Sequence, residues 1–528
     1  MTYTTLSFFV FCAIVFFGYH VLPRRARWCW LLLASIVFYA QASASTIAFL
    51  VVSAVTIYLG GLYVGRLNDR QKDELASREE MTPKEKRAYR NAVRKKQRLV
   101  VALVVAVNAG VLLVFKFYNQ TVDLLKVWYT PQVDLPLLTI LAPIGLSFYS
   151  LQAISYIVDV YRDKIPCEKN PLMLMLYLCY FPVIVQGPIS RYSDLVPKFK
   201  AGGDPVDDTT VTRGLNLMLW GLMKKLIIAD RLAILVGNVF DATVPYEGVY
   251  LTVGIMLYSI QIYCDFSGGI DIVSGFSRTL GIDLVKNFDH PYFSRSIPEF
   301  WRRWHITLGA WLREYIFYPI SLSKPVGKIS MKARRKFGPR VGKMIPVYLS
   351  LCVVWVLNGA WHGSRLQFIL FGVYHGLLTM GGMLFEDVFA KMKSALRIKT
   401  ECFSWRLFQM ARTFLLGCVG RIIYKAPDVS AAGAMLVSIF TTANFHVLFD
   451  GSLLRLGLSP LDFSVLSISV LVLLGVSWVQ EKRSVSQWLA QQNFFFRIAV
   501  YALAIVVLLA LGIYGPGYSA AQFIYGRY

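Results

Sequence analysis

The sequence has no long polar segment of the kind that forms the surface of a soluble domain. It contains 528 residues, of which 56% are hydrophobic, and apolar runs recur from Leu6 to Leu511. A soluble protein of this length would divide into several domains, each with a polar surface of its own. In a bilayer, apolar side chains can instead form the outer surface. We therefore expect an all-α, polytopic membrane protein.

The apolar runs define the expected membrane spans, because each crossing helix requires about 20 mostly apolar residues. The clear candidates are Leu6–Val21, Thr46–Val64, Leu99–Phe117, Leu137–Val160, Leu215–Val239, Val249–Tyr263, Val347–Trp361, Phe368–Met383, Phe408–Ile423, Phe463–Val479 and Ile498–Tyr514. Weaker runs raise the expected total to about a dozen helices. We expect one integral membrane domain over residues 1–528.

The sequence also lacks cysteine pairs with a functional spacing. None of the eight cysteines forms a CxxC pair, and most lie inside apolar runs. A free cysteine in such a run behaves as a small packing residue. We therefore expect neither disulfides nor a bound metal. The first apolar run has no small-residue cleavage site, so we expect a retained helix and not a removed signal.

Acidic residues are scarce. The chain has 31 Asp and Glu against 55 Lys and Arg, a net charge of +24. The basic residues concentrate in two loops, residues 67–98 and 321–345, which lie between apolar runs. This pattern is typical of cytoplasmic loops that meet anionic lipid. No nucleic-acid motif accompanies them, so we expect no nucleic-acid partner. Attraction of a phosphate-bearing donor such as coenzyme A is the alternative.

The basic clusters agree on one orientation. If residues 67–98 are cytoplasmic, the cluster of Arg24, Arg25 and Arg27 two runs earlier is cytoplasmic as well. Lys482 and Arg483 precede the last apolar run. We therefore expect a multi-pass protein of the cytoplasmic membrane whose N-terminus and C-terminus are both extracytoplasmic.

The stretch from Tyr263 to Ile320 is too polar for ordinary spans and too aromatic for a solvated loop. Ionisable groups at membrane depth must face protein or a water-filled cavity. Glycines 268, 269, 275 and 281 permit tight bends. We expect short, broken and partly in-plane helices that line an interior cavity. The alternative for Phe300–Ile320 is an interfacial amphipathic helix without chemistry.

His362 stands near the end of an apolar run, in the sequence NGAWHG. Burial favours a neutral imidazole, which is the form that a general base requires. Asn358 lies four residues earlier and so on the same helical face. It could orient the ring or donate to a carbonyl oxygen. The alternative is a histidine that is hydrogen-bonded to a neighbouring helix.

The other histidines divide into two groups. His305 lies in WRRWHI among aromatic and basic residues and is the second candidate, with a structural hydrogen bond as the alternative. His375, in VYHGLL, is expected to be a packing residue, and His20 and His446 lie at expected span ends and are weak candidates.

These segments resemble the membrane-bound O-acyltransferase superfamily, particularly its bacterial branch of polysaccharide and cell-wall acylation proteins. The matching segments are Pro143–Arg162, Tyr180–Phe199, Gly221–Ala233, Tyr263–Gly275, Phe300–Ile320 and Asn358–Gly363. They follow the family's order, and the resemblance as a whole covers about residues 10 to 425. Additional helices and a tail would occupy residues 425–528.

The resemblance implies a ring of spans around a thinned centre, with a tunnel where a cytoplasmic donor meets an acceptor from the other side. It implies that His362 is the principal catalytic residue and that His305 is the second polar site. Ala360 departs from the larger apolar residue that is common in the family, which should alter the width of the pocket.

The C-terminal sequence QFIYGRY resembles an aromatic ending found in this branch. On that resemblance, Tyr525 would accept the acyl group and relay it outside. Gly526 and Arg527 depart from the aromatic pattern. The alternative is a tyrosine that anchors the chain at the membrane interface.

The resemblance implies transfer of an acyl group, acetyl first, from acetyl-CoA or another thioester toward an exported or cell-wall polysaccharide. Since no GxSxG motif or extracellular hydrolase-like domain occurs in the chain, it also implies a separate extracellular or periplasmic transferase. The alternative within the class is D-alanyl transfer from a carrier protein to teichoic acid. A transporter without chemistry would show paired broken helices in repeated halves, and the sequence has no self-similar halves.

Overall fold

The computed structural model describes residues 2–78, 81–128, 136–138, 142–241 and 246–514, and within these ranges every regular element is a helix. The chain forms two compact units. Unit 1 comprises Met1–Gly214 with Phe276–Val285, and unit 2 comprises Leu215–Gly275 with Lys286–Tyr528. An all-α protein is confirmed, whereas the single domain expected from the sequence stays a prediction.

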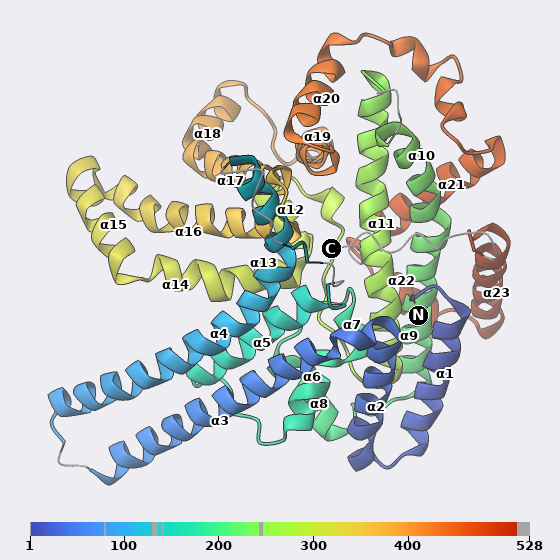
Figure 1. Cartoon of the computed structure of the whole chain (residues 1–528). Helices are drawn as coiled ribbons and strands as arrows, with labels where there is room; N and C mark the ends of the chain where they lie inside the picture. The colour runs from blue at the N-terminus through green and yellow to red at the C-terminus, as the bar shows by residue number, and fades with distance from the viewer. Residues whose placement is uncertain (1, 79–80, 129–135, 139–141, 242–245, 515–528) are drawn as a thin grey trace. The chain divides into compact units, whose positions relative to one another are not determined.

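Unit 1 contains the long helices of the N-terminal region (Figure 1). Its elements are α1 (Leu6–Val21), α2 (Arg24–Ser43), η1 (Ala44–Thr46), α3 (Ile47–Ser77), α4 (Pro83–Trp128), α5 (Leu146–Tyr161), α6 (Pro171–Cys179), α7 (Phe181–Ile184), α8 (Tyr192–Ala201) and the start of α9 (Asp208–Leu222).

Helices α3, α4 and α5 pack together through polar and small residues. Asn68 on α3 donates to the carbonyl oxygen of Val160 at 2.9 Å and accepts from Gln97 of α4 at 2.6 Å. A Cβ at Gly61 would lie 3.0 Å from the ring of Tyr156, so the missing side chain lets α3 approach α5. Small residues and interhelical hydrogen bonds of this kind are typical of helix contacts in membranes.

Unit 2 contains the remaining helices, many of them short. After α9 they are η2 (Met223–Ala229), α10 (Asp230–Phe240), α11 (Val249–Thr279), η3 (Pro291–Phe293), α12 (Ile297–Arg303), α13 (Ile306–Leu312), η4 (Arg313–Phe317), α14 (Tyr318–Ser321), α15 (Lys324–Phe337), α16 (Pro339–His362), α17 (Leu366–Leu384), α18 (Glu386–Ala395), α19 (Phe403–Lys425), α20 (Val429–Thr441), η5 (Phe445–Leu448), η6 (Ser452–Arg455), α21 (Pro460–Gln480), α22 (Val485–Ala490) and α23 (Phe494–Leu511).

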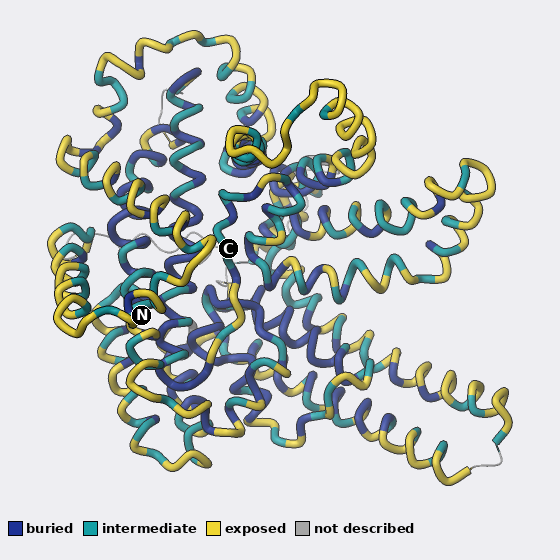
Figure 2. The backbone as a smooth tube through the Cα atoms, turned by 180° about the vertical axis from the view of Figure 1, so that it is seen from behind, coloured by how far each residue is buried: buried dark blue, intermediate teal, exposed yellow. Residues whose placement is uncertain are grey.

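Seven helices in the described ranges are long and apolar enough to cross a membrane. They are Ala44–Ser77, Pro83–Lys126, Val249–Thr279, Pro339–His362, Leu366–Leu384, Pro460–Gln480 and Phe494–Leu511. Many large apolar side chains on the helices are exposed, among them Leu59, Leu471 and Phe495. Figure 2 shows that exposed residues, drawn in yellow, recur along many of the helices. Such a surface would aggregate in water and suits contact with lipid. The polytopic membrane architecture is therefore confirmed.

The expected breaks between Tyr263 and Gly281 are wrong in part, because residues 263–279 continue α11 without interruption. A Cβ at Gly268 would lie 2.9 Å from the carbonyl oxygen of Gly221 on α9. This glycine thus permits a close helix crossing and does not bend the chain. Gly281, which follows the helix, does adopt a positive φ of 71°.

Two expected spans also differ in their bounds. In the run Leu137–Val160, α5 begins at Leu146, because Pro143 lies just before it and Gly145 adopts a positive φ of 71° at the N-cap. The run Leu215–Val239 contains a π-helical turn, η2, between α9 and α10. Turns of this type often occur near functional sites.

Broken helices are confirmed between residues 297 and 321. Helices α12 and α13 have seven residues each, and η4 and α14 follow them directly. The chain turns sharply at His305, which separates α12 from α13 with a positive φ of 46°. These short helices bring aromatic and basic side chains from a small part of the sequence to one place in unit 2.

Candidate active site

Helices α16 and α17 position His362 and Asn358 by an unusually close contact. A Cβ at Gly359 would lie 2.4 Å from the carbonyl oxygen of Phe368, and one at Gly372 would lie 2.2 Å from that of Trp355. Backbones can approach this closely only where side chains are absent. Because Gly359 lies between Asn358 and His362 on α16, the contact fixes the position of the helix end that carries both residues.

His362 is the last residue of α16 and is 5% exposed. Its ring lies among aromatic rings, with centroid distances of 5.0 Å to Trp361, 5.4 Å to Tyr424 and 6.0 Å to Phe371. It lines a small cavity of about 30 Å³, which we call the inner cavity.

The inner cavity takes its walls from five helices of unit 2: α11, α12, α16, α17 and α19. Its lining comprises Ile262, Phe300, Trp301, Trp304, His362, Phe371, His375, Gly417, Arg421 and Tyr424. A cavity of about 10–15 Å³ on this measure holds one water molecule, so the inner cavity has room for a group of only a few heavy atoms.

His305 is held by a buried hydrogen-bonded group at the start of α13. The side-chain oxygen of Asn287 lies 3.2 Å from Nδ1 of His305 and accepts from the backbone N–H and the hydroxyl of Thr307 at 3.0 Å and 2.8 Å. The imidazole is 3% exposed and meets the ring of Phe266 at a centroid distance of 4.9 Å. The residue is therefore fixed in both backbone and ring position.

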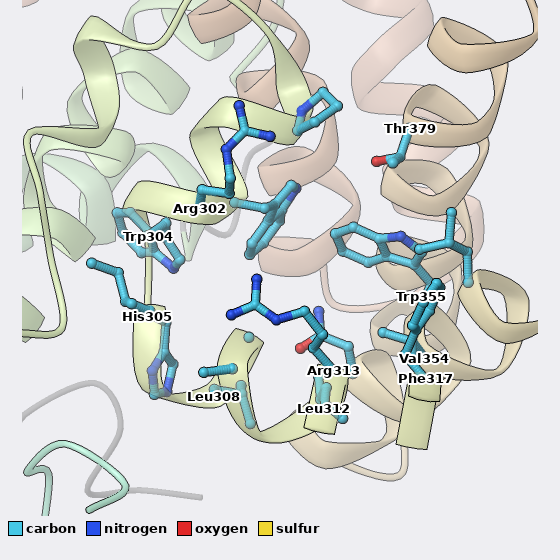
Figure 3. A pocket seen from close by; sticks show the side chains of 17 residues that line it. Arg302, Trp304, His305, Leu308, Leu312, Arg313, Phe317, Val354, Trp355 and Thr379 are labelled. Carbon is cyan, nitrogen blue, oxygen red and sulfur yellow. The ribbon is translucent and has the colours of Figure 1, made fainter. Parts of the chain in front are cut away.

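A larger cavity of about 450 Å³, the outer cavity, is lined by His305 and Asn358 (Figure 3). Figure 3 shows the side chain of Arg313 extending between Trp304 and Trp355. The described lining of the outer cavity includes Arg302 and Arg313 but no acidic residue. The outer cavity is thus a largely apolar space with two basic groups.

The two cavities are neighbours. Trp301 and Trp304 belong to the linings of both, so their indoles stand between the spaces. Trp361 links the two histidines, because its ring lies 5.7 Å from that of His305 and 5.0 Å from that of His362. His305 and Asn358 therefore share the outer cavity, whereas His362 lies at the inner one. Tyr525 lies outside the described residues.

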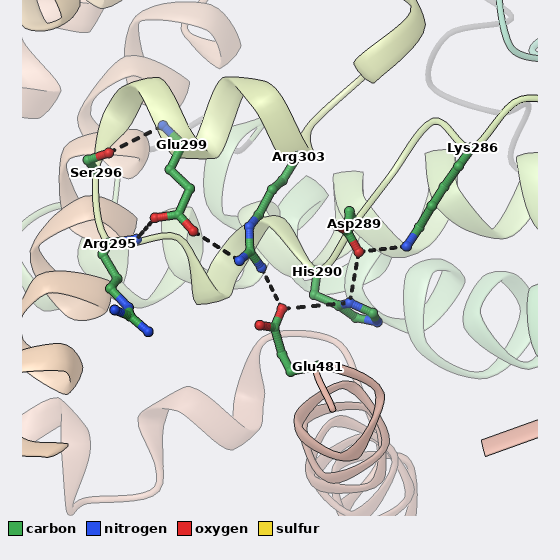
Figure 4. Close-up of polar contacts among 8 residues, drawn as sticks. All are labelled: Lys286, Asp289, His290, Arg295, Ser296, Glu299, Arg303 and Glu481. Atoms are coloured by element: carbon green, nitrogen blue, oxygen red, sulfur yellow. Dashed lines mark hydrogen bonds and ion pairs between the residues drawn. The ribbon is translucent and has the colours of Figure 1, made fainter. Parts of the chain in front are cut away.

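Ion pairs hold the segment that carries these tryptophans (Figure 4). Arg303 of α12 pairs with Glu299 at 2.9 Å and with Glu481 at 2.5 Å. His290 lies 3.8 Å from the same carboxylate of Glu481 and 3.3 Å from that of Asp289. The network ties α12 to the end of α21 and so fixes the helix between Ser296 and Trp304.

The acidic residues of α11 are satisfied by lysines of η2. Lys225 pairs with Asp265 at 2.6 Å and with Asp230 at 2.9 Å, and Lys224 pairs with Asp271 at 2.7 Å. Four of these five side chains are at most 4% exposed, and that of Asp271 is 24% exposed. The aspartates of α11 thus belong to an interior network of ion pairs. No group of acidic, histidine or cysteine residues suited to a metal occurs in the part of the chain that the structure describes.

Sequence reasoning missed the contribution of α19. Arg421 and Tyr424 reach the inner cavity from this helix, and both are 6% exposed. A charged residue inside the apolar run FLLGCVGRIIYK was a signal, because such residues face the protein interior. His375, expected to pack, is buried between the rings of Trp301 and Phe371 and also lines the inner cavity.

Comparison with known proteins agrees with this architecture. Residues 167–333 match the model of the membrane-bound O-acyltransferase family. The chain is 31% identical over 477 residues to the probable alginate O-acetylase AlgI of Pseudomonas aeruginosa. The aligned residues cover 90% of this chain and 81% of that protein. The chain is 29% identical over 404 residues to the peptidoglycan O-acetyltransferase of Helicobacter pylori, covering 71% of this chain and 68% of that protein.

The chain is also similar to a third relative. The teichoic acid D-alanyltransferase of Bacillus subtilis is 27% identical over 277 residues, which cover 51% of this chain and 66% of that protein. The match to the alginate relative is decisive, because 31% identity extends over 90% of this chain and 81% of that protein. The chain belongs to the membrane-bound O-acyltransferase family and is an O-acyltransferase.

Proposed function

We propose that this protein transfers an acetyl group from a cytoplasmic thioester, acetyl-CoA first, for O-acetylation of an exported or cell-wall polysaccharide. The observation that carries the proposal is the place of His362, a buried imidazole at a small cavity beside the larger outer cavity. The larger space suits the donor and the smaller space suits the group that is transferred.

His362 acts as the general base in this proposal. Its imidazole removes the proton from the attacking hydroxyl, whose oxygen then bonds to the carbonyl carbon of the thioester. The carbon–sulfur bond breaks, and the departing thiolate takes the proton from His362. Since the site is buried, water is excluded and hydrolysis of the thioester is limited. From the sequence, Asn358 was a possible donor to a carbonyl oxygen and His305 the second polar site. Their place on the outer cavity favours contact of both with the donor.

The dimensions of the inner cavity support a short acyl group. A space of about 30 Å³ between the rings of His362, Phe371 and Tyr424 leaves little room beyond two carbons. Each extra methylene against a fixed apolar wall reduces transfer by about 10-fold to 200-fold. The names of the alginate and peptidoglycan relatives, both O-acetylating proteins, point in the same direction.

The basic lining of the outer cavity supports a phosphate-bearing donor. Arg302 and Arg313 lie there without a described acidic neighbour in the lining, and arginine binds phosphate through its planar set of N–H groups. Coenzyme A carries several phosphates and an elongated apolar arm, which together suit a largely apolar cavity with two guanidinium groups.

The direct acceptor is either Tyr525 or a hydroxyl of a separate extracellular or periplasmic transferase, which then acylates the polysaccharide. The relay through Tyr525 requires the C-terminus to be extracytoplasmic, as the distribution of Lys and Arg predicts. Radiolabelled acetyl-CoA given to the purified protein, followed by peptide mapping, tests the relay. Label on the C-terminal peptide that is absent in Tyr525→Phe would support it, and equal labelling of both would reject it.

The ester content of the polysaccharide tests the function in cells. A strain that lacks this chain would be complemented with the wild type, with His362→Ala or with His446→Ala. His446 is a matched control because it is a histidine whose side chain is 71% exposed. We expect O-acetyl ester to return with the wild type and His446→Ala only. Normal ester content in a strain that expresses His362→Ala at the wild-type level would reject the proposal.

D-alanyl transfer is the second candidate, favoured by the similarity to the B. subtilis D-alanyltransferase. Its donor would be an acidic carrier protein, which the basic helix α15 could bind, since six of its fourteen residues, Lys324, Lys328, Lys332, Arg334, Arg335 and Lys336, are basic. Donor competition separates the candidates. Release of thiol from acetyl-CoA supports acetylation, whereas turnover of only a D-alanyl carrier thioester supports the alternative.

A further inference from the structure

Arg421 is a buried cation that pairs with no carboxylate of the described residues. Its side chain is 6% exposed, and it extends from a helix that is otherwise mainly apolar. Among the described residues no Asp or Glu lies within ion-pair distance of it. Burial of an unpaired guanidinium costs several kcal/mol, so proteins retain such a group where it serves a function.

Aromatic faces hold the guanidinium in place. Its central carbon lies 5.4 Å from the ring centroids of Tyr292 and Phe300 and 5.5 Å from that of Trp304. Nη2 donates one hydrogen bond to the hydroxyl of Tyr292 at 3.3 Å. Cation–π contacts stabilise a desolvated cation, and they leave the N–H groups at the edge of the guanidinium available.

The other terminal nitrogen, Nη1, is fully buried and has no hydrogen-bond partner among the residues that the structure describes. It lies over Gly417, one turn earlier on α19, where a Cβ would approach it to 2.9 Å. Gly417 and Arg421 both line the inner cavity together with His362. An N–H donor without a partner therefore lies at the space where, in the proposed function, the acyl group is held.

We infer that Arg421 stabilises the oxyanion of the acyl-transfer transition state. The inference rests on the proposed function of His362. When the hydroxyl oxygen bonds to the carbonyl carbon, the electron pair of the C=O bond moves to the carbonyl oxygen, and the guanidinium donates a hydrogen bond to it. The pair returns as the carbon–sulfur bond breaks, and the thiolate leaves with the proton held by His362. A fixed donor in a dry site stabilises this charge far more than water does.

The inference also assigns a function to Gly417. Its missing side chain leaves the space that Nη1 occupies, so Gly417→Ala should displace the guanidinium without removing its charge. Alanine favours a helix more than glycine does, so the helix itself should not be weakened. The variant thus tests whether the position of the guanidinium matters while its charge is kept.

Steady-state kinetics in nanodiscs test the inference, with thiol release from acetyl-CoA as the signal. We expect Arg421→Gln to lower kcat by about 10²-fold to 10³-fold with KM changed less than about threefold. Arg421→Lys should recover part of the loss, and Gly417→Ala should lower kcat by at least about tenfold, because small displacements of a catalytic group are costly. Arg406→Gln, on the exposed part of the same helix, is the matched control and should keep wild-type kinetics.

The outcomes separate the inference from the proposed function. Wild-type kcat in both Arg421→Gln and Gly417→Ala, with His362→Ala inactive, would overturn the inference and leave the proposed function intact. Activity in His362→Ala would overturn the function itself. If Arg421→Gln does not fold, Gly417→Ala and Arg421→Lys decide, and unchanged kcat in both overturns the inference. Restored turnover of Arg421→Ala on addition of guanidinium ion would support it, since a purely structural residue would not respond.

Discussion

The ring of Tyr424 meets the ring of His362 edge to face, with centroids 5.4 Å apart and planes inclined at 88°. The phenol is 6% exposed and also packs against Phe368 at 4.9 Å and Phe371 at 5.3 Å. Tyr424 thus closes one side of the inner cavity, and its volume limits the size of any group held beside the imidazole.

Tyr424→Leu should therefore widen the range of acyl donors. Loss of the ring enlarges the inner cavity, so we expect the ratio of kcat/KM for propionyl-CoA to that for acetyl-CoA to rise by about tenfold or more. Competition between the two thioesters at the purified protein measures this ratio. Tyr424→Phe keeps the ring and is the control. An unchanged ratio in Tyr424→Leu, with the protein still folded, would show that another wall sets the size limit.

Trp301 separates the two cavities and should protect the thioester from water. It packs against Trp355 at 5.1 Å and His375 at 4.9 Å and lines both spaces. In Trp301→Leu the cavities should merge, and the fraction of thiol released without acyl transfer should rise at least about threefold because water reaches the site. Trp488→Leu, at a tryptophan that is 48% exposed, is the control. If every thiol released by Trp301→Leu were still matched by a transferred acyl group, Trp301 would not protect the thioester from water.

Arg313 should bind a phosphate of the donor. We expect Arg313→Gln to raise KM for acetyl-CoA by about tenfold, since loss of one charged hydrogen-bonded contact costs about 1.5–3 kcal/mol. The same variant should show wild-type KM with S-acetyl-pantetheine, which has no phosphate. The comparison of the two donors is informative even if both turn over slowly. Equal effects on both would mean that Arg313 does not recognise the nucleotide part of the donor.

His305 combines an unusual backbone with a site on the outer cavity. Its φ of 46° is tolerated by asparagine better than by alanine. We expect His305→Asn to keep the thermal midpoint of the wild type within a few degrees and to raise KM, whereas His305→Ala should lower the midpoint as well. Differential scanning fluorimetry and initial rates measure the two effects. Wild-type KM in His305→Asn would limit His305 to a structural role.

The sequence was sufficient to predict the class of fold and much of the candidate site. Apolar runs predicted the long helices α3, α4, α16 and α17, because spans of about 20 residues depend on composition alone. The motif around Phe300 predicted broken helices, which η4 and the turn at His305 confirm. Periodicity also placed Asn358 and His362 at the end of one helix, as observed.

What the sequence could not supply was the packing between distant segments. Gly268 looked like a bend because its contact with Gly221 on another helix has no local signature. For the same reason, the sequence did not show that Asn358 and His362, which share a helix, line different cavities. Trp301 of α12 and Trp304, which follows α12, stand between the two cavities. Arg421 lies some sixty residues beyond His362 in the chain, and only the folded structure brings it to the inner cavity.

Proton removal by His362 is the central claim, and single-turnover acyl transfer measures it most directly. Wild-type protein and His362→Ala, both folded in nanodiscs, would be mixed with saturating radiolabelled acetyl-CoA and a hydroxyl acceptor, and labelled ester would be followed over time. We predict that the rate constant in His362→Ala falls by about 10²-fold to 10⁴-fold, the usual contribution of a general base. Ester formation at the wild-type rate in His362→Ala would contradict the claim.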